Sequence, residues 1–472
     1  MYRTLQGIAQ GQLIIEKPLE TYYFPAKTDN SQLHVSAVAT SSRPKATIVL
    51  KNRRFFLRLV ASPDLGFAEA YMFGDIDVEP DQLVDVFRIF ILNSRTKVIT
   101  SFTTSALTRI FSIPARVTVG RFVASLQNAQ PNISAHYDLG NDIFAAFLSK
   151  DMTYSCAIFP SLDADLKLGE SGPAREGMED DLHNAQMRKL RHIIEKADIR
   201  PGHRVLEIGS GWGSLSCLIA ETIENTTIET ITLSVQQADY VQNKLVQDGL
   251  TDRVRVHLMD YRAMPLEWQG AFDRVVSIEM IEAVGKEFYE TYFAKIDWAL
   301  KKDTGVAVIQ GITIPEARDA EYVKTEDFIR KWVRSYCKPL IHVFPGGILP
   351  TVTQLTSAVV SAASGRLLVE SINNIGPHYA RTLREWRRRF EAGIGPSVIT
   401  LKVHCTCVTA LRDEFPDVMQ GARGREEIEV FRRKWIYYFC YCEVGFTMRL
   451  LGVHILTLTR EGNADYGCKT FA

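Results

Sequence analysis

The stretch RVLEIGSGWGS, residues 204–214, has the residue types of a ligand-binding turn between a strand and a helix. Its apolar first half predicts a strand, and glycines follow at alternate positions, Gly209, Gly211 and Gly213. Glycine has no Cβ atom, so the backbone can turn sharply here and approach a bound molecule closely. Dinucleotides, nucleoside triphosphates and S-adenosylmethionine are all bound by loops of this general kind.

The residues around the glycines distinguish these ligands. A dinucleotide site needs a further glycine three positions after the second one, where this chain has Ser214, and an acid about twenty residues later. A phosphate loop needs a lysine, which is absent. Glu207 before the first glycine and Asp260 at the end of VRVHLMD instead favour S-adenosylmethionine, which has an ammonium group and an adenine but no pyrophosphate. A strand–helix turn without a ligand is the less favoured alternative.

Segments with the periodicities of strands and helices alternate around this loop. The amphipathic helix HNAQMRKLRHIIEKADI precedes it, and the strands TIETITLS, RVRVHLMD, FDRVVSIEM and TGVAVIQGI follow, separated mostly by helical segments. This order predicts a mostly parallel α/β sheet with helices on both faces. Ligands of such sheets bind at the carboxyl ends of the strands, where the glycine loop is expected.

We predict four parts along the chain. They are an N-terminal extension (1–44), a small α+β domain (45–92), a basic linker (93–130) and the main domain (131–472). In the small domain, ATIVLKNRRFFLRLV is expected to form a hairpin. Between residues 86 and 137 no acidic residue occurs, whereas six basic residues stand among apolar ones: Arg88, Arg95, Lys97, Arg109, Arg116 and Arg121. This segment is expected either to lie at anionic headgroups or to pack on the main domain as a connector.

Composition excludes several classes of protein. The chain has 472 residues, 46% of them hydrophobic, and 55 basic residues balance 55 acidic ones, which argues against a bulk nucleic-acid binder. Eight cysteines without a CxxC pair favour a reducing compartment over a disulfide scaffold. The N-terminus does not have the pattern of a signal peptide. No run of about eighteen apolar residues occurs, so we expect a cytoplasmic protein that reaches membranes only peripherally, without a transmembrane segment.

Seven motifs, in this order along the chain, resemble those of cyclopropane-fatty-acyl-phospholipid synthases, of which mycolic acid cyclopropane synthases are a related branch. They are HYDLGNDIFAAFLSKDMTYSCAIF (136–159), LEIGSGWGSLS (206–216), ITLSVQQADYV (231–241), FDRVVSIEMIEAVG (272–285), FPGGILP (344–350), GPHYARTLREWRRRF (376–390) and YYFCYCEVGF (437–446). The resemblance covers residues 45–460. It implies a Rossmann-like class I methyltransferase with a seven-stranded, mostly parallel sheet and a small N-terminal, lipid- or membrane-associated α+β domain. The implied partner is an unsaturated phospholipid at the membrane surface, with a homodimer as one expected assembly and no metal ion.

The resemblance also implies which residues hold the cofactor and a base. The S-adenosylmethionine site is expected to comprise Tyr154, Ser155, Glu207, Gly209, Gly211, Trp212, Gly213, Thr232, Leu233, Ser234, Gln237, Asp260 and Tyr261. Members of the family hold a bicarbonate ion as base, with ligands that match Cys156, Glu282, Tyr379 and Cys442. Gln310 stands where bacterial members place a histidine, and its amide can donate a hydrogen bond but cannot carry a proton. Taken singly, each of these residues is explained by an ordinary role in the core or at a helix end.

The chemistry of the reaction agrees with such a site. An isolated cis double bond is a poor nucleophile, so the methyl group must be held close to it and in line. Methyl transfer leaves a carbocation on the chain, and loss of a proton from the new methyl group closes a three-membered ring. The base must therefore lie in a dry, mostly apolar cavity, where aromatic faces can stabilise the cation.

Two alternatives to cyclopropane formation remain open. One is methyl transfer that gives a branched or methylene-substituted chain, and the other is a catalytically impaired lipid-binding homologue. Two inserts, 332–341 and 393–407, depart from the family pattern and are read as surface loops or as translated non-coding sequence. His136 and Asp138 are expected to shape an entrance helix. The basic cluster Arg384, Arg387, Arg388 and Arg389 is expected to be a solvated helix face or a headgroup contact.

Overall fold

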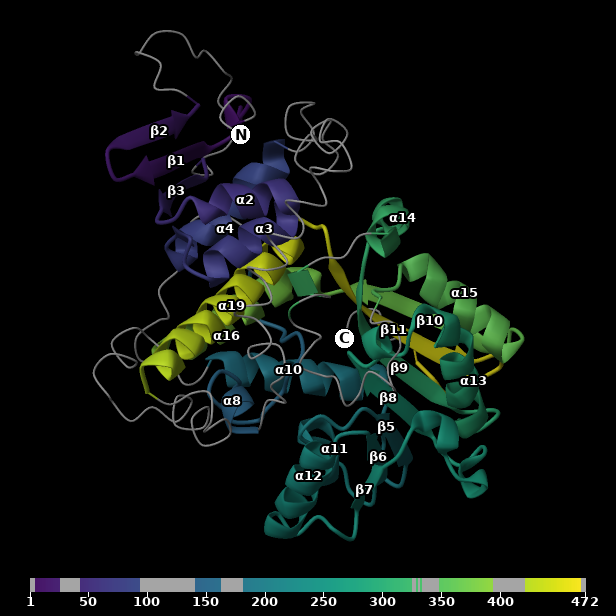
Figure 1. The fold of residues 1–472 in the computed structure, drawn as a ribbon. Coiled ribbons are helices and arrows are strands. Elements are labelled where there is room, and N and C mark those ends of the chain that lie inside the picture. Colours follow the sequence, from purple (N-terminus) through teal and green to yellow (C-terminus); the bar gives the residue numbers. More distant parts are fainter. Residues whose placement is uncertain are drawn as a thin grey trace.

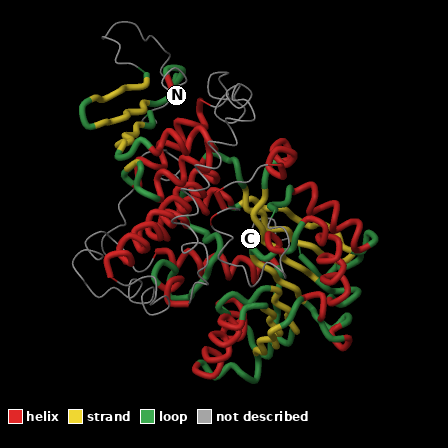
Figure 2. Tube along the Cα trace, viewed as in Figure 1, coloured by secondary structure: helices red, strands yellow, loops and turns green. Residues whose placement is uncertain are grey.

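The computed structural model describes residues 5–25, 43–93, 141–162, 181–324, 328–329, 332, 348–393 and 421–467. Figures 1 and 2 show a mostly helical N-terminal part beside a larger part built on a second sheet. Residues 94–130 of the predicted linker lie outside the described residues, and so do His136 and Asp138. Of the six basic residues of the segment 86–137, only Arg88 is described. Of the two predicted inserts, only Trp332 and Gly393 are described.

The main part contains the seven-stranded sheet that the family resemblance implies. Its strand order is β10-β11-β9-β8-β5-β6-β7. Strands β5 to β9 are parallel to one another, whereas β11 runs antiparallel to both of its neighbours, β9 and β10. The strands are β5 (Arg204–Ile208), β6 (Thr227–Thr232), β7 (Val254–Leu258), β8 (Arg274–Ile278), β9 (Val306–Thr313), β10 (Leu367–Asn374) and β11 (Gly452–Arg460). The predicted mostly parallel sheet is confirmed.

Helices cover both faces of this sheet (Figure 1). Val205 belongs to the core that includes α10 and α11, whereas the next residue, Leu206, belongs to a second core with α13 and α15. Successive strand residues point to opposite faces, so strands buried on both sides are apolar at most positions. The helices are α10 (Asp181–Lys196), α11 (Ser214–Thr222), α12 (Val235–Gln247), α13 (Tyr289–Ala299), α14 (Glu316–Lys324) and α15 (Val352–Ala363).

The N-terminal part is a four-stranded sheet packed with helices. The sheet has the order β2-β1-β3-β4, and β1 pairs in parallel with β3, so it crosses the boundary that we placed between residues 44 and 45. Its elements are β1 (Gln12–Lys17), β2 (Glu20–Phe24), β3 (Lys45–Leu50), α2 (Arg54–Ala61), α3 (Pro63–Met72), β4 (Ile76–Asp77) and α4 (Pro80–Asn93).

The predicted hairpin in this part is wrong, because only its first half is a strand, β3, and its second half is helix α2. Phe55 and Arg58 stand three residues apart and are both buried on one face of α2. Arg58 forms ion pairs with Glu69 at 3.2 Å and Asp75 at 2.8 Å. These partners are eleven and seventeen residues away, so sequence periodicity does not show why Arg58 is buried.

Two long helices join the two parts: α16 (Gly376–Gly393) and α19 (Gly421–Thr447) lie side by side below α4 (Figure 1). Arg433 on α19 donates hydrogen bonds to the backbone carbonyls of Tyr71 and Ile76 in the N-terminal part. Arg387 on α16 is buried and pairs with Asp81 on α4.

Internal ion pairs correct two expectations about basic residues. Arg387 is buried and Arg384 pairs with Glu443 at 2.8 Å, so the expected solvated face or headgroup contact is wrong for these two arginines. Arg88 is also buried, and it pairs with Asp85 at 2.7 Å. Among the described residues, no helix combines the length and the apolar character needed to cross a bilayer.

Candidate active site

The glycine loop follows β5 at the carboxyl edge of the sheet, as predicted. Gly209, Gly211 and Gly213 have φ angles of +97°, +49° and +82°, a region that other residues rarely adopt. A Cβ atom at Gly209 would lie 3.3 Å from the side chain of Met280, whereas one at Gly211 would meet no atom of the chain within 4 Å. The loop therefore leaves open space where a ligand can approach the backbone, and this space fits the predicted cofactor.

The other predicted cofactor residues follow the neighbouring strands β6 and β7. Thr232, Leu233, Ser234 and Gln237 span the turn from β6 into α12, where the Ser234 hydroxyl accepts a hydrogen bond from the backbone N–H of Gln237 at 3.2 Å. Asp260 and Tyr261 follow β7. The structure thus brings three successive loops to one edge of the sheet. The part of these residues in binding S-adenosylmethionine stays a prediction.

Arg262 holds the carboxylate of Asp260. Its Nε lies 2.9 Å from Oδ1 and its Nη2 lies 2.6 Å from Oδ2. Burial would raise the pKa of Asp260, but the hydrogen bonds from Arg262 outweigh it and lower this pKa below its usual value. Asp260 is therefore charged at neutral pH. An adenine that bonds to this carboxylate must share it with Arg262.

Glu207 lies inside β5 and holds the glycine loop in place. Its carboxylate accepts hydrogen bonds from the hydroxyls of Ser216 on α11 and Thr230 on β6, the latter at 2.7 Å. Burial raises the pKa of Glu207 to about 7, although these hydrogen bonds and the charge of Lys189 oppose the shift. This acid ties together the helix and the strand that flank the loop.

An extended segment, residues 152–159, lies across the loop and contributes Tyr154, Ser155 and Cys156. Helix α8 (Asn141–Ala145) links the segment to the loop. The Trp212 indole donates a hydrogen bond to the side-chain oxygen of Asn141 at 2.9 Å. The ring centroid of Phe144 lies 5.1 Å from that of Trp212 and 5.3 Å from that of Tyr154. Ser155 accepts a hydrogen bond from the ammonium of Lys189 at 2.8 Å. All three residues were predicted for the site, and the structure brings them to it.

The centre of the site is Glu279, which the sequence analysis missed. It follows β8 directly, and its φ angle of +50° is uncommon for a residue with a side chain. Three groups donate to its carboxylate: the backbone N–H of Cys156 at 2.9 Å and the amide of Gln310 at 2.8 Å bond to Oε1, and the hydroxyl of Tyr379 at 2.8 Å bonds to Oε2. Three predicted site residues from distant parts of the chain therefore meet at one carboxylate.

Cys156 takes part in this cluster through its backbone. Its buried thiol is directed at the backbone carbonyls of Ala157, at 3.4 Å, and Ile375, at 3.7 Å. Burial and then the charge of Glu279 raise the pKa of this thiol well above its usual value. Cys156 is therefore a neutral thiol, and the interpretation of its side chain as a ligand of an anion is not supported by these contacts.

Glu282 and Cys442 lie beside the cluster. Glu282 accepts a hydrogen bond from the backbone N–H of Ile312, and its other oxygen is buried without a hydrogen-bond partner among the described residues. Burial and then the charge of Glu279 raise the pKa of Glu282 to about 8. Cys442 stands one turn from Tyr438 on α19, and Tyr438 bonds to Tyr154 across 3.1 Å. Burial raises the pKa of Tyr438, and both Cys442 and Glu279 act on it, so the two groups share one neighbourhood.

Lys189 is a second residue that the sequence analysis missed. It is fully buried on α10, and burial lowers its pKa to about 8 against the opposing charges of Glu279, Asp151 and Glu207. Its charge reaches both the acid of the glycine loop and the acid at the centre of the site. Its position in the amphipathic pattern of α10 predicts only burial. A buried lysine needs an anionic or polar partner, and this requirement was the available signal.

The predicted bicarbonate does not fit this arrangement. The groups expected to bind it at Gln310, Tyr379 and Cys156 already donate hydrogen bonds to Glu279. A second anion would have to displace a carboxylate of the chain or lie against it, and like charges in contact are unfavourable. We derive no step through bicarbonate.

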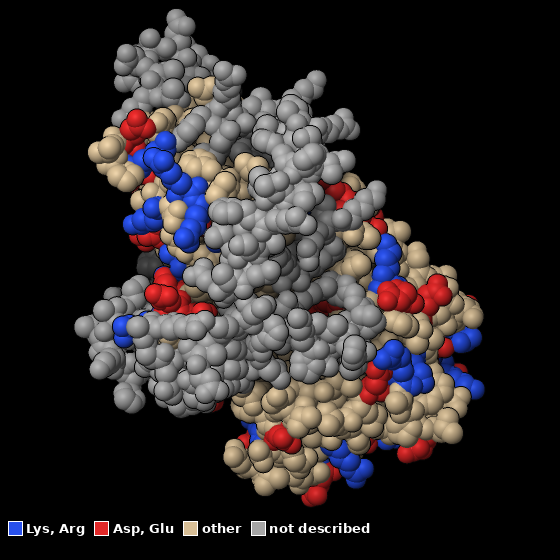
Figure 3. All heavy atoms as spheres, in the orientation of Figure 1, with Lys and Arg blue, Asp and Glu red and all other residues tan. Residues whose placement is uncertain are grey.

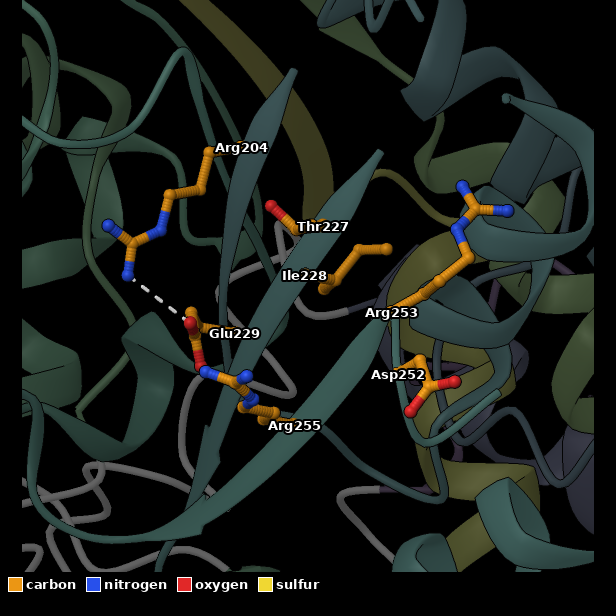
Figure 4. Close-up of a pocket in the computed structure, with 7 residues that line it drawn as sticks. All are labelled: Arg204, Thr227, Ile228, Glu229, Asp252, Arg253 and Arg255. Carbon is orange, nitrogen blue, oxygen red and sulfur yellow. Dashed lines mark hydrogen bonds and ion pairs between the residues drawn. The ribbon is translucent and has the colours of Figure 1, made fainter. Parts of the chain in front are cut away.

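The cavity shown in Figure 4 is not part of this site. Its lining comes from the amino ends of β5, β6 and β7: Arg204, Thr227, Ile228, Glu229, Asp252, Arg253 and Arg255. Arg204 pairs with Glu229 at 3.2 Å, and Arg253 donates to backbone carbonyls, among them that of Thr226. The cavity therefore lies at the opposite edge of the sheet from the glycine loop, where internal bonds occupy Arg204 and Arg253.

Comparison with known proteins agrees with this geometry. The family model described as mycolic acid cyclopropane synthetase matches residues 124–404. The chain belongs to this family. The cyclopropane-fatty-acyl-phospholipid synthase of Escherichia coli is 32% identical over 89% of this chain and 89% of its own length. The tuberculostearic acid methyltransferase UfaA1 of Mycobacterium tuberculosis is 36% identical over 72% of this chain and 67% of its own length.

Solved structures show how this member of the mycolic acid cyclopropane synthetase family is built. The cyclopropane synthase MmaA2 from M. tuberculosis matches with a TM-score of 0.50 at 24% identity, over 70% of this chain and 97% of that protein. Coclaurine N-methyltransferase matches with a TM-score of 0.51 at 17% identity, over 84% of this chain and 98% of that protein. At these identities the matches concern the fold alone. The predicted class I methyltransferase fold is confirmed.

Proposed function

We propose that the protein transfers a methylene group from S-adenosylmethionine to the cis double bond of an unsaturated fatty acyl chain in a phospholipid, forming a cyclopropane ring. The observation that carries this proposal is the similarity to the E. coli cyclopropane-fatty-acyl-phospholipid synthase over 89% of both chains. That length requires more than the methyltransferase fold, so it includes much of the N-terminal part. The mycobacterial cyclopropane mycolic acid synthase 1, in contrast, matches only 57% of this chain.

The residues of the site support such a reaction. When bound, S-adenosylmethionine supplies an electrophilic methyl group on a sulfonium. Tyr379 stacks on Phe446 at 4.7 Å, and Trp386 packs 5.0 Å from Tyr154 and 5.8 Å from Tyr379. These rings exclude water from the neighbourhood of Glu279, and their faces stabilise a cation on the acyl chain by about 0.5–2 kcal/mol each.

A second candidate is methyl transfer that gives a branched or methylene-substituted acyl chain. The 36% identity to a tuberculostearic acid methyltransferase favours it. Both reactions begin with the same cation and differ in which proton leaves. An impaired lipid-binding homologue is the third outcome.

Lipid analysis with a labelled methyl group separates these functions. The purified chain is incubated with vesicles of unsaturated phospholipid and S-adenosylmethionine that carries a trideuterated methyl group, and the fatty acids are analysed by gas chromatography and mass spectrometry. A cyclopropane product retains two of the three deuterium atoms and resists mild hydrogenation. A methylene product also retains two but is reduced, and an alkene formed by proton loss from the chain retains three. No product, together with cofactor binding by calorimetry, identifies an impaired homologue.

Cys442→Ala and Glu282→Gln are each expected to lower turnover about 10-fold or more with little change in affinity for S-adenosylmethionine. The charge of Glu279 acts on Glu282, and Cys442 and Glu279 both act on Tyr438, so we expect these two residues to serve the reacting acyl chain rather than the cofactor. Turnover and calorimetric affinity are measured on the same preparations. Equal losses in both quantities would show that these residues are misplaced in the mechanism.

Peripheral membrane association of the N-terminal part belongs to the same proposal. Helix α2 buries Arg58 and exposes apolar residues, since Leu57 is 38% and Val60 is 53% exposed. Exposed basic residues precede them, Lys51, Arg53 and Arg54. Figure 3 shows lysine and arginine side chains gathered over this part of the molecule. Apolar side chains beside basic ones are typical of a surface that inserts among anionic headgroups.

The double variant Leu57→Ser/Val60→Ser is expected to bind vesicles of phosphatidylglycerol and phosphatidylcholine about 10-fold more weakly, because two half-exposed apolar side chains no longer enter the lipid. Co-sedimentation at low and high salt measures the binding. Leu266→Ser is the matched control, since Leu266 is 83% exposed in the loop after β7. Equal weakening by both variants would contradict a role for α2.

A further inference from the structure

We propose that the carboxylate of Glu279 is the base that closes the cyclopropane ring, so that this chain carries in its own sequence the anion expected from bicarbonate. The inference rests on the proposed function, since it assigns the proton-accepting group of that reaction. It assigns a catalytic residue for which neither the glycine loop nor the family motifs gave a role.

The hydrogen bonds of Glu279 are those of a bound anion. Its Oε1 accepts from the Cys156 backbone at 2.9 Å and from Gln310 at 2.8 Å, while its Oε2 accepts only from Tyr379, at 2.8 Å. A carboxylate oxygen has two lone pairs, so Oε2 keeps one for a proton. The other carboxamide atom of Gln310, Oε1, is buried without a partner among the described residues, so this side chain is positioned for its single donation.

The backbone at Glu279 also indicates a functional constraint. Its φ angle of +50° lies in the region that favours glycine, and the surrounding structure must hold a residue with a side chain there. The next residue, Met280, would contact a Cβ atom at Gly209, so Glu279 is adjacent in the sequence to a residue that touches the loop expected to hold the cofactor. The carboxylate therefore belongs to a residue beside a contact with the cofactor loop, and it is bonded to Tyr379, whose ring stacks on Phe446.

The charges around Glu279 decide which acid is ionised. Burial raises the pKa of Glu279, whereas its three donors and the charge of Lys189 oppose the shift. Glu282 accepts one backbone hydrogen bond, and its pKa is raised to about 8, so it keeps its proton at neutral pH while Glu279 carries the charge. The other titratable groups that face Glu279 are Cys156, Tyr379 and Tyr438, all neutral because burial raises their pKa values well above the usual ones.

The proton transfer balances as follows. The electron pair of the double bond forms a C–C bond to the methyl carbon while the C–S bond breaks, which releases neutral S-adenosylhomocysteine and leaves the other alkene carbon cationic. Glu279 takes one proton from the new methyl group, and the electron pair of that C–H bond forms the second C–C bond of the ring. The carboxylic acid then returns its proton to water when the product leaves. No oxidant, reductant or second anion is consumed.

The first test compares the wild-type chain in carbon dioxide-depleted buffer with and without added bicarbonate. Turnover of unsaturated phospholipid vesicles is expected to change less than twofold. A loss of turnover of tenfold or more on depletion, restored by bicarbonate, would overturn the inference and leave the cyclopropane reaction standing. Absence of any cyclopropane product under both conditions would count against the proposed function itself.

The second test removes the carboxylate. Glu279→Gln is expected to lower turnover about 100- to 10,000-fold, the usual contribution of a general base, with an affinity for S-adenosylmethionine within about threefold of wild type. Glu279→Gly relieves the backbone conformation and leaves space among the three donors. This variant is expected to be as inactive as Glu279→Gln but to regain at least tenfold turnover with added bicarbonate or formate, which a purely structural role would not produce.

Glu282→Gln is the matched control, since Glu282 stands three residues away but is not bonded to the three donors. Its residual turnover is expected to be insensitive to bicarbonate and formate. Retention of more than a tenth of wild-type turnover by Glu279→Gln would exclude Glu279 as the base. Restoration of Glu282→Gln by the small anions would equally contradict the assignment.

Discussion

Replacing Lys189 by methionine is expected to lower turnover at neutral pH about 10- to 100-fold and to move the acid limb of the pH–rate profile to higher pH. The ammonium of Lys189 is buried and lowers the pKa of both Glu279 and Glu207. Without it both pKa values rise further, because only the hydrogen bonds to these carboxylates then oppose the effect of their burial. A base must be unprotonated to act, so a base with a raised pKa becomes active only at a higher pH. Initial rates across the pH range measure the shift.

Lys196→Met is the matched control for this prediction. Lys196 is also fully buried and lies two turns further along α10, where its charge lowers the pKa of His192. Both variants lose a buried charge and are expected to be less stable to thermal unfolding. Only Lys189→Met is expected to change the pH profile. An equal loss of turnover at every pH in Lys189→Met would mean that this lysine serves packing alone.

Replacing Gly211 by asparagine is expected to weaken binding of S-adenosylmethionine about 10- to 100-fold while the folded chain remains intact. Asparagine tolerates the φ angle of +49°, and a Cβ atom at Gly211 meets no atom of the chain within 4 Å. A cofactor that approaches the loop backbone closely would meet the new side chain, at a cost of about 1–3 kcal/mol. Calorimetric titration gives the affinity, and thermal unfolding reports the integrity of the fold.

Gly202→Asn is the matched control for Gly211→Asn, because it places asparagine at another glycine with a positive φ angle. Gly202 has a φ angle of +81° in the turn before β5 and equally open surroundings, but it stands at the amino end of that strand. Its replacement is expected to leave cofactor affinity within about twofold, as for a surface substitution. Unchanged affinity in Gly211→Asn would mean that the cofactor lies elsewhere, and the proposed function would then lose its structural support.

The local sequence determined much of the fold and of the cofactor loop. The β5 strand, the glycines at Gly209 and Gly213 and the helices that follow are encoded in short windows, because apolar periodicity and glycine placement act over a few residues. The same information failed for residues 54–61, where a buried Arg58 among apolar residues looked like part of a hairpin. Its partners are Glu69 on α3 and Asp75 just before β4, and the bonds to them explain why the buried face of this helix carries a charge.

The arrangement of the candidate active site was decided by the tertiary structure. The family motifs identified Cys156, Gln310 and Tyr379 as site residues, but only the fold brings them onto Glu279, from an extended segment, a central strand and the first turn of α16. In the sequence, Glu279 is one of two acids that follow the strand β8, the other being Glu282. Lys189 is one of several basic residues on an amphipathic helix. Which carboxylate is charged depends on donors more than thirty residues away in either direction. Periodicity and spacing describe neighbours along the chain, whereas burial and charge pairing depend on neighbours in space.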